Sequence, residues 1–136
     1  RTVVDIILKG YMTKYPNVKI MLPHCGAMLP YVVDRINSFK PVLIKTGTVT
    51  EDFDVYAEYK KFWFDSGWAS GLRQIPDVME VVDHSRFVYA TDWPFTPVPV
   101  IESQADAIFA NPIYTEKFKQ KIAMENALKL FPGIKL

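Results

Sequence analysis

The chain has 136 residues, of which 49% are hydrophobic, 14% aromatic and 23% charged, and its formal net charge is +1. This composition excludes a mainly disordered chain, and the near balance of charge argues against a nucleic-acid-binding or membrane-binding surface. The length suits one domain without a second substantial core. A single cysteine excludes an internal disulfide framework and favours a reducing compartment, so we expect a cytoplasmic protein.

The first part of the chain alternates helical and strand patterns. Apolar residues recur every three to four positions over residues 2–15, which predicts an amphipathic helix that ends at Pro16. The apolar run 18–22 predicts a short buried strand. Residues 29–39 predict a second amphipathic helix.

The middle of the chain repeats this alternation. Residues 45–50 are expected to form a loop, and a helix is predicted over residues 50–61, with its first threonine as the cap. The aromatic run 62–65 predicts a second buried strand. A helix follows within residues 71–82, and its true start is expected near Pro76 because proline is favoured in the first turn of a helix.

The last part of the chain predicts a third strand at residues 86–90, a stiff loop at 96–99, and helices at 100–109 and 115–130. Short apolar strands that alternate with amphipathic helices are typical of α/β folds with parallel strands and right-handed crossovers. The sequence therefore predicts an α/β fold.

All three predicted strands end in a residue that can do chemistry, namely His24, Asp65 and Asp92. Parallel α/β folds gather ligands at the carboxyl ends of their strands. His24 could be a hydrogen-bonded structural residue or an acid/base group. Asp92 could be a turn residue, or a carboxylate whose buried charge needs a metal ion or a histidine. Asp65 could simply cap the segment after it.

Two further residues are assigned structural roles. Cys25 is expected to pack in the core, because its side chain alternates away from that of His24. His84 precedes the third strand at the amino end, where chemistry is rare in this architecture, and we expect it to be exposed and without a function.

Three segments carry a family resemblance: residues 18–30 with Pro-His-Cys-Gly, residues 86–95 with Thr-Asp-Trp-Pro-Phe, and residues 126–132 with Asn-Ala-Leu-Lys-Leu-Phe-Pro. They resemble the strand-six, strand-eight and closing-helix signatures of the amidohydrolase-related metal-dependent hydrolases and decarboxylases, of the aminocarboxymuconate-semialdehyde decarboxylase type. The resemblance implies a TIM (β/α)8 barrel with one divalent metal ion, zinc or manganese, at the strand carboxyl ends. Residues 1–136 would form strands six to eight of that single domain.

The resemblance also implies roles for individual residues. Asp92 matches the strand-eight aspartate that binds the metal and can take a proton, and His24 matches the strand-six acid/base histidine. Arg35 matches an arginine that reaches a substrate carboxylate across a dimer interface, although it could also be an ordinary surface ion-pair former. Trp93 and Phe95 match residues that line the substrate pocket. The alternative is that they only pack at the rim of the barrel.

Part of the family pattern is absent. Asp65 corresponds to a strand-seven aspartate for which the resemblance gives no role, and Cys25 stands where the family usually has glycine. A His-x-His pair and a further histidine complete the family's metal site, but the two histidines here are His24 and His84. The chain also begins at Arg1 within a helical pattern. We therefore expect the amino-terminal part of the domain to be missing and the metal not to be held tightly by this chain alone.

Three functions remain in competition. The resemblance favours a homo-oligomeric enzyme that decarboxylates small aromatic or unsaturated carboxylic acids. Metal-dependent hydrolysis of a lactone, ester or amide is the alternative within the family. The alternative from another class is a non-catalytic fragment that lacks most metal ligands.

Overall fold

A small parallel sheet lies at the centre of the molecule. The structure is a computed structural model that describes residues 1–49, 53–69 and 72–134. Its strands β1 (Met21–Leu22), β2 (Trp63–Asp65) and β3 (Phe87–Val88) are parallel and lie in the order β1-β2-β3. The predicted α/β class is confirmed. The paired strands are shorter than the apolar runs that predicted them.

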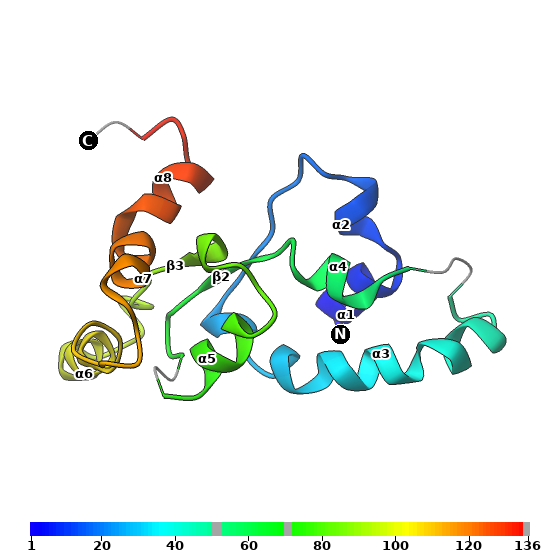
Figure 1. Cartoon of the computed structure of the whole chain (residues 1–136), viewed down its shortest axis with the longest axis horizontal. Coiled ribbons are helices and arrows are strands. Elements are labelled where there is room, and N and C mark those ends of the chain that lie inside the picture. Colours follow the sequence, from blue (N-terminus) through cyan, green and yellow to red (C-terminus); the bar gives the residue numbers. More distant parts are fainter. Residues whose placement is uncertain (50–52, 70–71, 135–136) are drawn as a thin grey trace.

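The amino-terminal helices lie on one side of this sheet (Figure 1). The predicted helix over residues 2–15 is two helices, α1 (Thr2–Leu8) and α2 (Tyr11–Lys14). Gly10 separates them with a left-handed φ of 63°, which glycine adopts without steric cost. The prediction of one continuous helix was therefore wrong at this glycine.

The long helix α3 (Leu29–Lys45) begins at the predicted residue but runs past its predicted end. It continues beyond residue 39 and takes in Lys45, where the predicted loop was to begin. Pro41 lies inside it and removes one backbone donor, but the helix continues, since only one intrahelical bond is lost at that position. A hydrogen bond of 2.8 Å from Lys40 Nζ to the Phe53 carbonyl holds this part of α3 to the next segment.

The middle helices are shorter than predicted. Helix α4 (Val55–Tyr59) is capped by Asp54, whose carboxylate accepts a 3.0 Å hydrogen bond from the Ala57 amide. The threonine expected to cap it lies at position 50, outside the described residues. Helix α5 (Gln74–Met79) starts two residues before Pro76, close to the expected place, and ends before residue 82.

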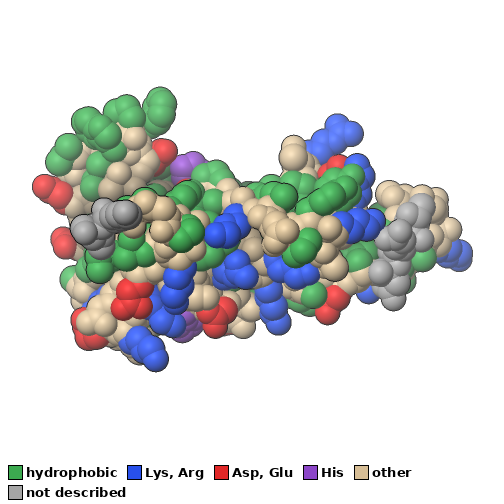
Figure 2. All heavy atoms as spheres, turned by 90° about the horizontal axis from the view of Figure 1, so that it is seen from above, with side chains coloured by type: hydrophobic (Ala, Val, Ile, Leu, Met, Phe, Trp, Pro, Cys, Tyr) green, Lys and Arg blue, Asp and Glu red, His purple; other side chains and the backbone are tan. Residues whose placement is uncertain are grey.

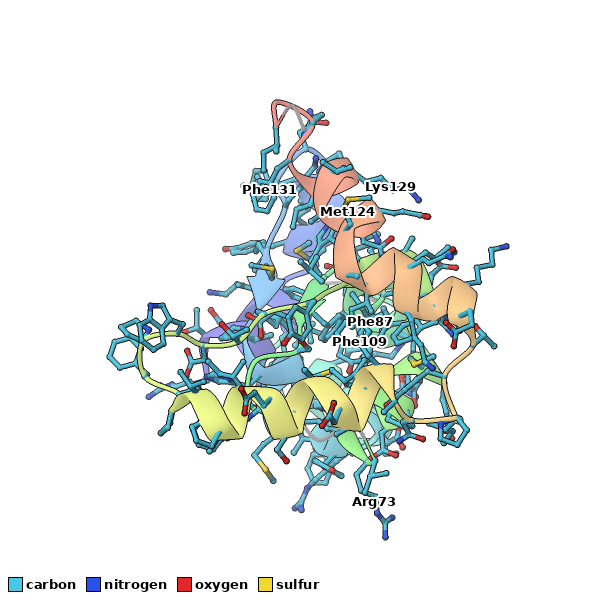
Figure 3. The ribbon with its side chains drawn as sticks, turned by 90° about the vertical axis from the view of Figure 1, so that its left-hand side faces the viewer. Arg73, Phe87, Phe109, Met124, Lys129 and Phe131 are labelled. Atoms are coloured by element: carbon cyan, nitrogen blue, oxygen red, sulfur yellow. The ribbon has the colours of Figure 1, made fainter. Side chains whose placement is uncertain are left out.

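The carboxyl-terminal helices lie on the other side of the sheet (Figure 1). Helix α6 (Val98–Phe109) begins two residues earlier than expected, with Pro99 in its first turn. One long helix follows as α7 (Glu116–Gln120), the π-helical turn η3 (Lys121–Glu125) and α8 (Asn126–Leu130), close to the predicted range 115–130, and the Thr115 hydroxyl caps its start. Phe87 and Phe109 lie in the interior between α6 and this long helix (Figure 3).

A row of aromatic rings joins the two sides through the core. Tyr59 of α4 contacts Phe64 of β2 at 5.4 Å between ring centroids, Phe64 contacts Phe87 of β3 at 5.8 Å, and Phe87 contacts Phe118 of α7 at 5.9 Å. All four side chains are at most 1% exposed. Leu22, Phe64 and Phe87 are aligned in the sheet, so they pack on one face of it. The opposite face is the one on which Asp65 lies.

The free edge of β3 is covered by the long helix. Val88 faces β2, so the Phe87 carbonyl and the Tyr89 amide point away from the sheet. The Asn126 side chain donates a 2.8 Å hydrogen bond to the Phe87 carbonyl, and the Ile122 carbonyl in η3 accepts from the Tyr89 amide at 2.8 Å. The Phe87 carbonyl and the Tyr89 amide therefore both have hydrogen-bond partners in the long helix.

Many apolar side chains remain exposed. Figure 2 shows hydrophobic groups over much of one face and gathered at one end, with lysine and arginine side chains over the middle. Within the described ranges, no helix is both long and apolar enough to cross a membrane.

Candidate active site

Asp65 ties the carboxyl ends of β1 and β2 together. Its Oδ1 atom accepts a 2.8 Å hydrogen bond from the His24 amide in the turn after β1 and a 3.0 Å bond from the Gly67 amide in its own turn. The second bond is the cap expected from Asp-Ser-Gly, while the first joins two strands. Asp65 thus brings the β1 and β2 turns into one site.

Ser66 ties the ends of β2 and β3 together. Its amide donates to the Val88 carbonyl at 3.1 Å, and its buried hydroxyl accepts from the Ala90 amide at 3.0 Å and donates to the Ala90 carbonyl at 3.2 Å. Gly67, next in sequence, lies against the third turn, since a methyl group there would approach Cβ of Asp92 to 3.5 Å. The predicted site residues His24, Asp65 and Asp92 are therefore gathered at one edge of the sheet.

The His24 ring is held by the backbone of the β2 turn. Its Nδ1 lies 2.8 Å from the Gly67 carbonyl oxygen. A carbonyl oxygen can only accept, so Nδ1 carries the proton and donates it. The neutral ring then keeps its lone pair on Nε2, the arrangement found in histidines that transfer protons or bind metals.

The three turns share an uncommon backbone conformation. In the part of the chain that the structure describes, the non-glycine residues with a left-handed φ are His24, Cys25, Ala27, Trp68 and Asp92. Each costs about 1–3 kcal/mol and persists only where its surroundings hold it. Such residues cluster at functional sites, and here all five lie in the turns that follow β1, β2 and β3.

The two aspartates differ in their electrostatic surroundings. Burial raises the pKa of the Asp65 carboxyl, the His24 and Gly67 amides and the His24 charge oppose this rise, and the nearby Asp92 charge adds to it. Asp92 is half-buried, and among the described residues no hydrogen-bond donor reaches its carboxylate. A half-buried carboxylate without a donor is suited to a cation or to a polar substrate group.

The residues expected to contact substrate lie at the surface. Trp93 and Phe95, directly after Asp92, are 66% and 82% exposed. Arg35 is exposed on α3, and in the described ranges its guanidinium makes no hydrogen bond or ion pair, so the alternative of a surface ion-pair former finds no partner there.

Two supporting residues were not anticipated from the sequence. The first is Ser66, which joins the ends of β2 and β3. The second is Gln74, whose Nε2 donates to the carbonyls of His24 at 2.7 Å and Ala27 at 2.9 Å. The Asp-Ser-Gly turn was the available signal for Ser66, while nothing in the local sequence singles out Gln74. Cys25 is buried and His84 is exposed, as predicted.

The described residues offer part of a metal site. Among them, no group of three or more His, Cys, Asp or Glu side chains could hold a metal ion. The acceptors that remain at the strand ends are the Asp92 carboxylate, Nε2 of His24 and Oδ2 of Asp65, whose two hydrogen bonds both fall on Oδ1. They fit one or two positions of a ligand set that needs further donors.

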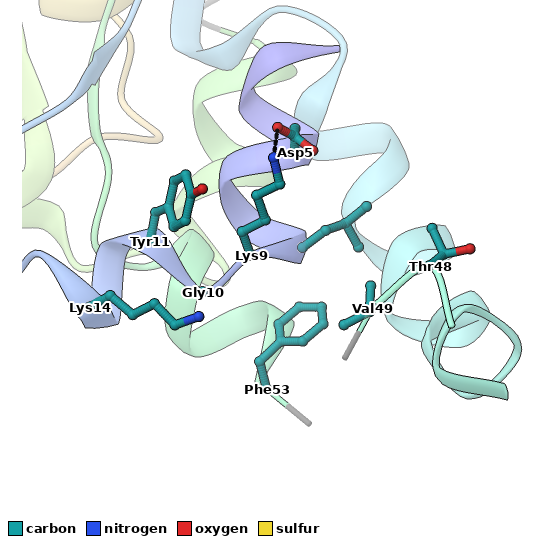
Figure 4. A pocket seen from close by; sticks show the side chains of 9 residues that line it. Asp5, Lys9, Gly10, Tyr11, Lys14, Thr48, Val49 and Phe53 are labelled. Atoms are coloured by element: carbon teal, nitrogen blue, oxygen red, sulfur yellow. Dashed lines mark hydrogen bonds and ion pairs between the residues drawn. The ribbon is translucent and has the colours of Figure 1, made fainter. Parts of the chain in front are cut away.

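A pocket of about 350 Å³ lies elsewhere, between α1, α2 and the segment after α3 (Figure 4). Its lining includes Asp5, Lys9, Tyr11 and Phe53, and none of the candidate site residues. Asp5 and Lys9 pair with each other at 2.9 Å. The pocket therefore has no chemical link to the strand-end site.

The fold and the strand-end site define a class of protein, an α/β protein with histidine and aspartate side chains at the carboxyl ends of its parallel strands. Residues 1–133 match the family described as Amidohydrolase. The chain belongs to this amidohydrolase family.

Individual relatives agree with this assignment. The chain is 28% identical to a 6-methylsalicylic acid decarboxylase of Penicillium expansum, over 99% of this chain and 41% of that protein. It is 30% identical to a gamma-resorcylate decarboxylase of Polaromonas sp., over 90% of this chain and 36% of that protein. A dihydroxybenzoic acid decarboxylase from Polaromonas sp., solved with bound manganese and 2-nitroresorcinol, shares the fold with a TM-score of 0.79 and 24% identity, over 98% of this chain and 40% of that one.

These relatives are much longer than the chain. The chain spans about two fifths of the length of each of them.

Proposed function

We propose that this chain belongs to a divalent-metal-dependent decarboxylase of small aromatic carboxylic acids. The observation that carries the proposal is the gathering of His24, with its oriented ring, and Asp92, with its unpaired carboxylate, at one edge of the sheet. The names of the curated relatives, decarboxylases of 6-methylsalicylic acid and gamma-resorcylate, supply the substrate class. A small-molecule carboxylate is the proposed ligand.

Residues 1–136 would form strands six to eight and the closing helices of a single TIM barrel domain. Three parallel strands in sequential order support this placement. A complete barrel has eight strands and typically about 250 residues. The remaining metal ligands would then come from a part of the domain outside this chain.

Asp92 is the residue of this chain that would hold the metal ion, zinc or manganese. Its carboxylate fits because no donor among the described residues competes for it. A bound divalent cation would supply Lewis-acid polarisation of the substrate carboxylate. Manganese in the related decarboxylase structure supports a divalent metal of this kind.

The chemistry of the chain's own residues centres on His24. Nε2 would take a proton from solvent and deliver it to the ring carbon that bears the carboxylate. The carbon–carbon bond then breaks, its electron pair returns to the ring, and carbon dioxide leaves. Trp93 and Phe95 would cover the aromatic ring, and their large exposed area is available for that contact.

Arg35 would bind an anionic group of the substrate from a neighbouring subunit. Its guanidinium is exposed and, in the described ranges, without an acidic partner, so it is available to a carboxylate. This role implies a homo-oligomer. The single cysteine, free and buried, is in keeping with the cytoplasmic location that we propose.

The test uses the chain together with an amino-terminal segment that supplies the other strands. We expect release of carbon dioxide from 6-methylsalicylate or 2,6-dihydroxybenzoate in the presence of Mn²⁺ or Zn²⁺. His24→Gln should lower kcat on the order of a hundredfold, the usual contribution of an acid/base group. Asp92→Asn should lose bound metal and activity together, whereas Asp106→Asn, an exposed aspartate on α6, should lose neither.

Two results would overturn the proposal. Lactone or ester hydrolysis without release of carbon dioxide would assign the chain to the hydrolases of the family. Full decarboxylation by Asp92→Asn would remove Asp92 from the metal site.

A further inference from the structure

The Asp65 carboxylate supports the turn that carries His24 through one of its two oxygens. Its Oδ1 atom receives the His24 amide at 2.8 Å and the Gly67 amide at 3.0 Å, so both bonds fall on one oxygen. A methyl group on Gly67 would approach this oxygen to 3.3 Å, which shows how closely the turn wraps around it. Asp65 thereby fixes two backbone units, one on each side of the His24 ring contact.

The same two backbone units determine which ring nitrogen of His24 carries the proton. His24 Nδ1 donates to the carbonyl of Gly67, the residue whose amide Asp65 holds. Free histidine favours the other tautomer, with the proton on Nε2. The observed contact reverses this preference and leaves the Nε2 lone pair for proton transfer.

The turn that carries His24 needs outside support. His24, Cys25, Gly26 and Ala27 have successive φ values of 54°, 52°, 80° and 51°. Non-glycine residues in this region each cost about 1–3 kcal/mol. Asp65 holds the turn through its His24 amide and Gln74 holds it through the carbonyls of His24 and Ala27, so two side chains from other elements maintain it.

We infer that Asp65 is a positioning residue, whose carboxylate holds the His24 and Gly67 backbones so that the Gly67 carbonyl fixes His24 in the Nδ1–H tautomer. The use of the free Nε2 for proton transfer rests on the proposed function. The tautomer of His24 can be measured whether or not the protein has the proposed activity.

Nitrogen-15 NMR of the histidine rings tests this inference on the full chain without an activity assay. His84→Gln removes the second histidine, which is exposed and outside the site, so that one ring remains in the spectrum. In this background, neutral His24 should show a protonated Nδ1 and an unprotonated Nε2. Asp65→Asn keeps an oxygen that accepts both amides and should keep this pattern.

Asp65→Ala should shift His24 towards the Nε2–H tautomer. Asp54→Ala is the matched control, because it also removes an aspartate that accepts a backbone amide, but at the start of α4. It should lower stability and leave the His24 signals in place. If Asp65→Ala does not fold, Gly67→Ala, which crowds Oδ1, replaces it.

A wild-type ring protonated on Nε2 would overturn the inference, and so would an unchanged tautomer in folded Asp65→Ala or Gly67→Ala. Failure of the proposed function gives a different result. In that case the tautomer pattern holds, but no carbon dioxide is released from aromatic acids by the reconstituted protein.

Discussion

Cys25 is directly next to His24 and is completely buried, with 0% of its surface exposed. Burial, with smaller contributions from the Asp65 and Asp77 charges, raises the pKa of its thiol from 9.0 to about 12. The folded thiol therefore keeps its proton in a pH range in which the unfolded thiol loses it. Because the folded state then binds more protons, the free energy of unfolding falls as the pH rises through this range.

This linkage predicts a difference between wild type and Cys25→Ala. From pH 9 to pH 10, wild type should lose about 1 kcal/mol more unfolding free energy than the variant, which has no thiol to titrate. Urea titrations at pH 7, 9 and 10 measure it. The values at pH 7 correct for the loss of stability that the alanine substitution itself causes. If the unfolding free energies of the two proteins changed in parallel with pH, the raised pKa of the Cys25 thiol would be contradicted.

For single residues, the sequence predicted which side chains gather at the strand ends, but it did not predict the hydrogen bonds between them. His24, Asp65 and Asp92 could be found because each follows an apolar strand. The bond from His24 Nδ1 to the Gly67 carbonyl depends on the backbone of residues 66–68, where Trp68 has a φ of 52°. No sequence pattern indicates that a tryptophan will adopt the left-handed backbone conformation. The orientation of the His24 ring could therefore not be predicted.

Among the secondary-structure elements, the turn η3 provides a hydrogen-bond acceptor for the edge of β3. The Asn126 amide bonds to the Lys121 carbonyl, five residues back, and the Ile122 carbonyl accepts the Tyr89 amide. Asn126 itself is 0% exposed and donates to the carbonyls of His84 and Phe87, each at 2.8 Å. The wide turn and one buried side chain together cover the strand edge.

Loss of the Asn126 side chain should therefore destabilise the protein. Asn126→Ala leaves two carbonyls without their donor in the interior, and we expect the unfolding free energy to fall by about 2–3 kcal/mol. Gln120→Ala, an exposed position on α7, should change it by less than about 0.5 kcal/mol. Denaturant unfolding of both variants decides this, and equal small effects would show that Asn126 does not hold the edge.

The helix boundaries show what local patterns can and cannot predict. The last helix was predicted to begin at residue 115, and the structure starts it there, with the Thr115 hydroxyl accepting the Phe118 amide at 3.2 Å. Gly10 was treated as a tolerated helical residue, yet it breaks the helix. The buried carboxylate of Glu58 accepts the Met12 amide at 2.8 Å and so holds the separate helix α2. That contact spans 46 positions, beyond the reach of a local pattern.

For the whole molecule, exposed apolar surface is the dominant feature. Phe95, Leu72, Met28 and Trp93 are 66–82% exposed. Large apolar patches on a protein surface usually mark an interface or a binding site. This surface agrees with the homo-oligomer that we propose.

Self-association of the chain should follow from this surface. We expect the weight-average sedimentation coefficient to rise with concentration in the micromolar range. Added salt should not reverse it, because apolar contacts are not screened by ions as charge pairs are. A monomer that sediments identically at all concentrations would rule out the association.

Asp65, Ser66 and Gly67 are three consecutive residues that reach the turns on both sides of β2. One tripeptide therefore links the turn that carries His24 to the turn that carries Asp92, and Gln74 of α5 adds a helix contact to the His24 turn alone. Amino-acid changes or insertions at the exposed positions of α3 or α6 can therefore alter the surface of the molecule and leave this link between the turns intact.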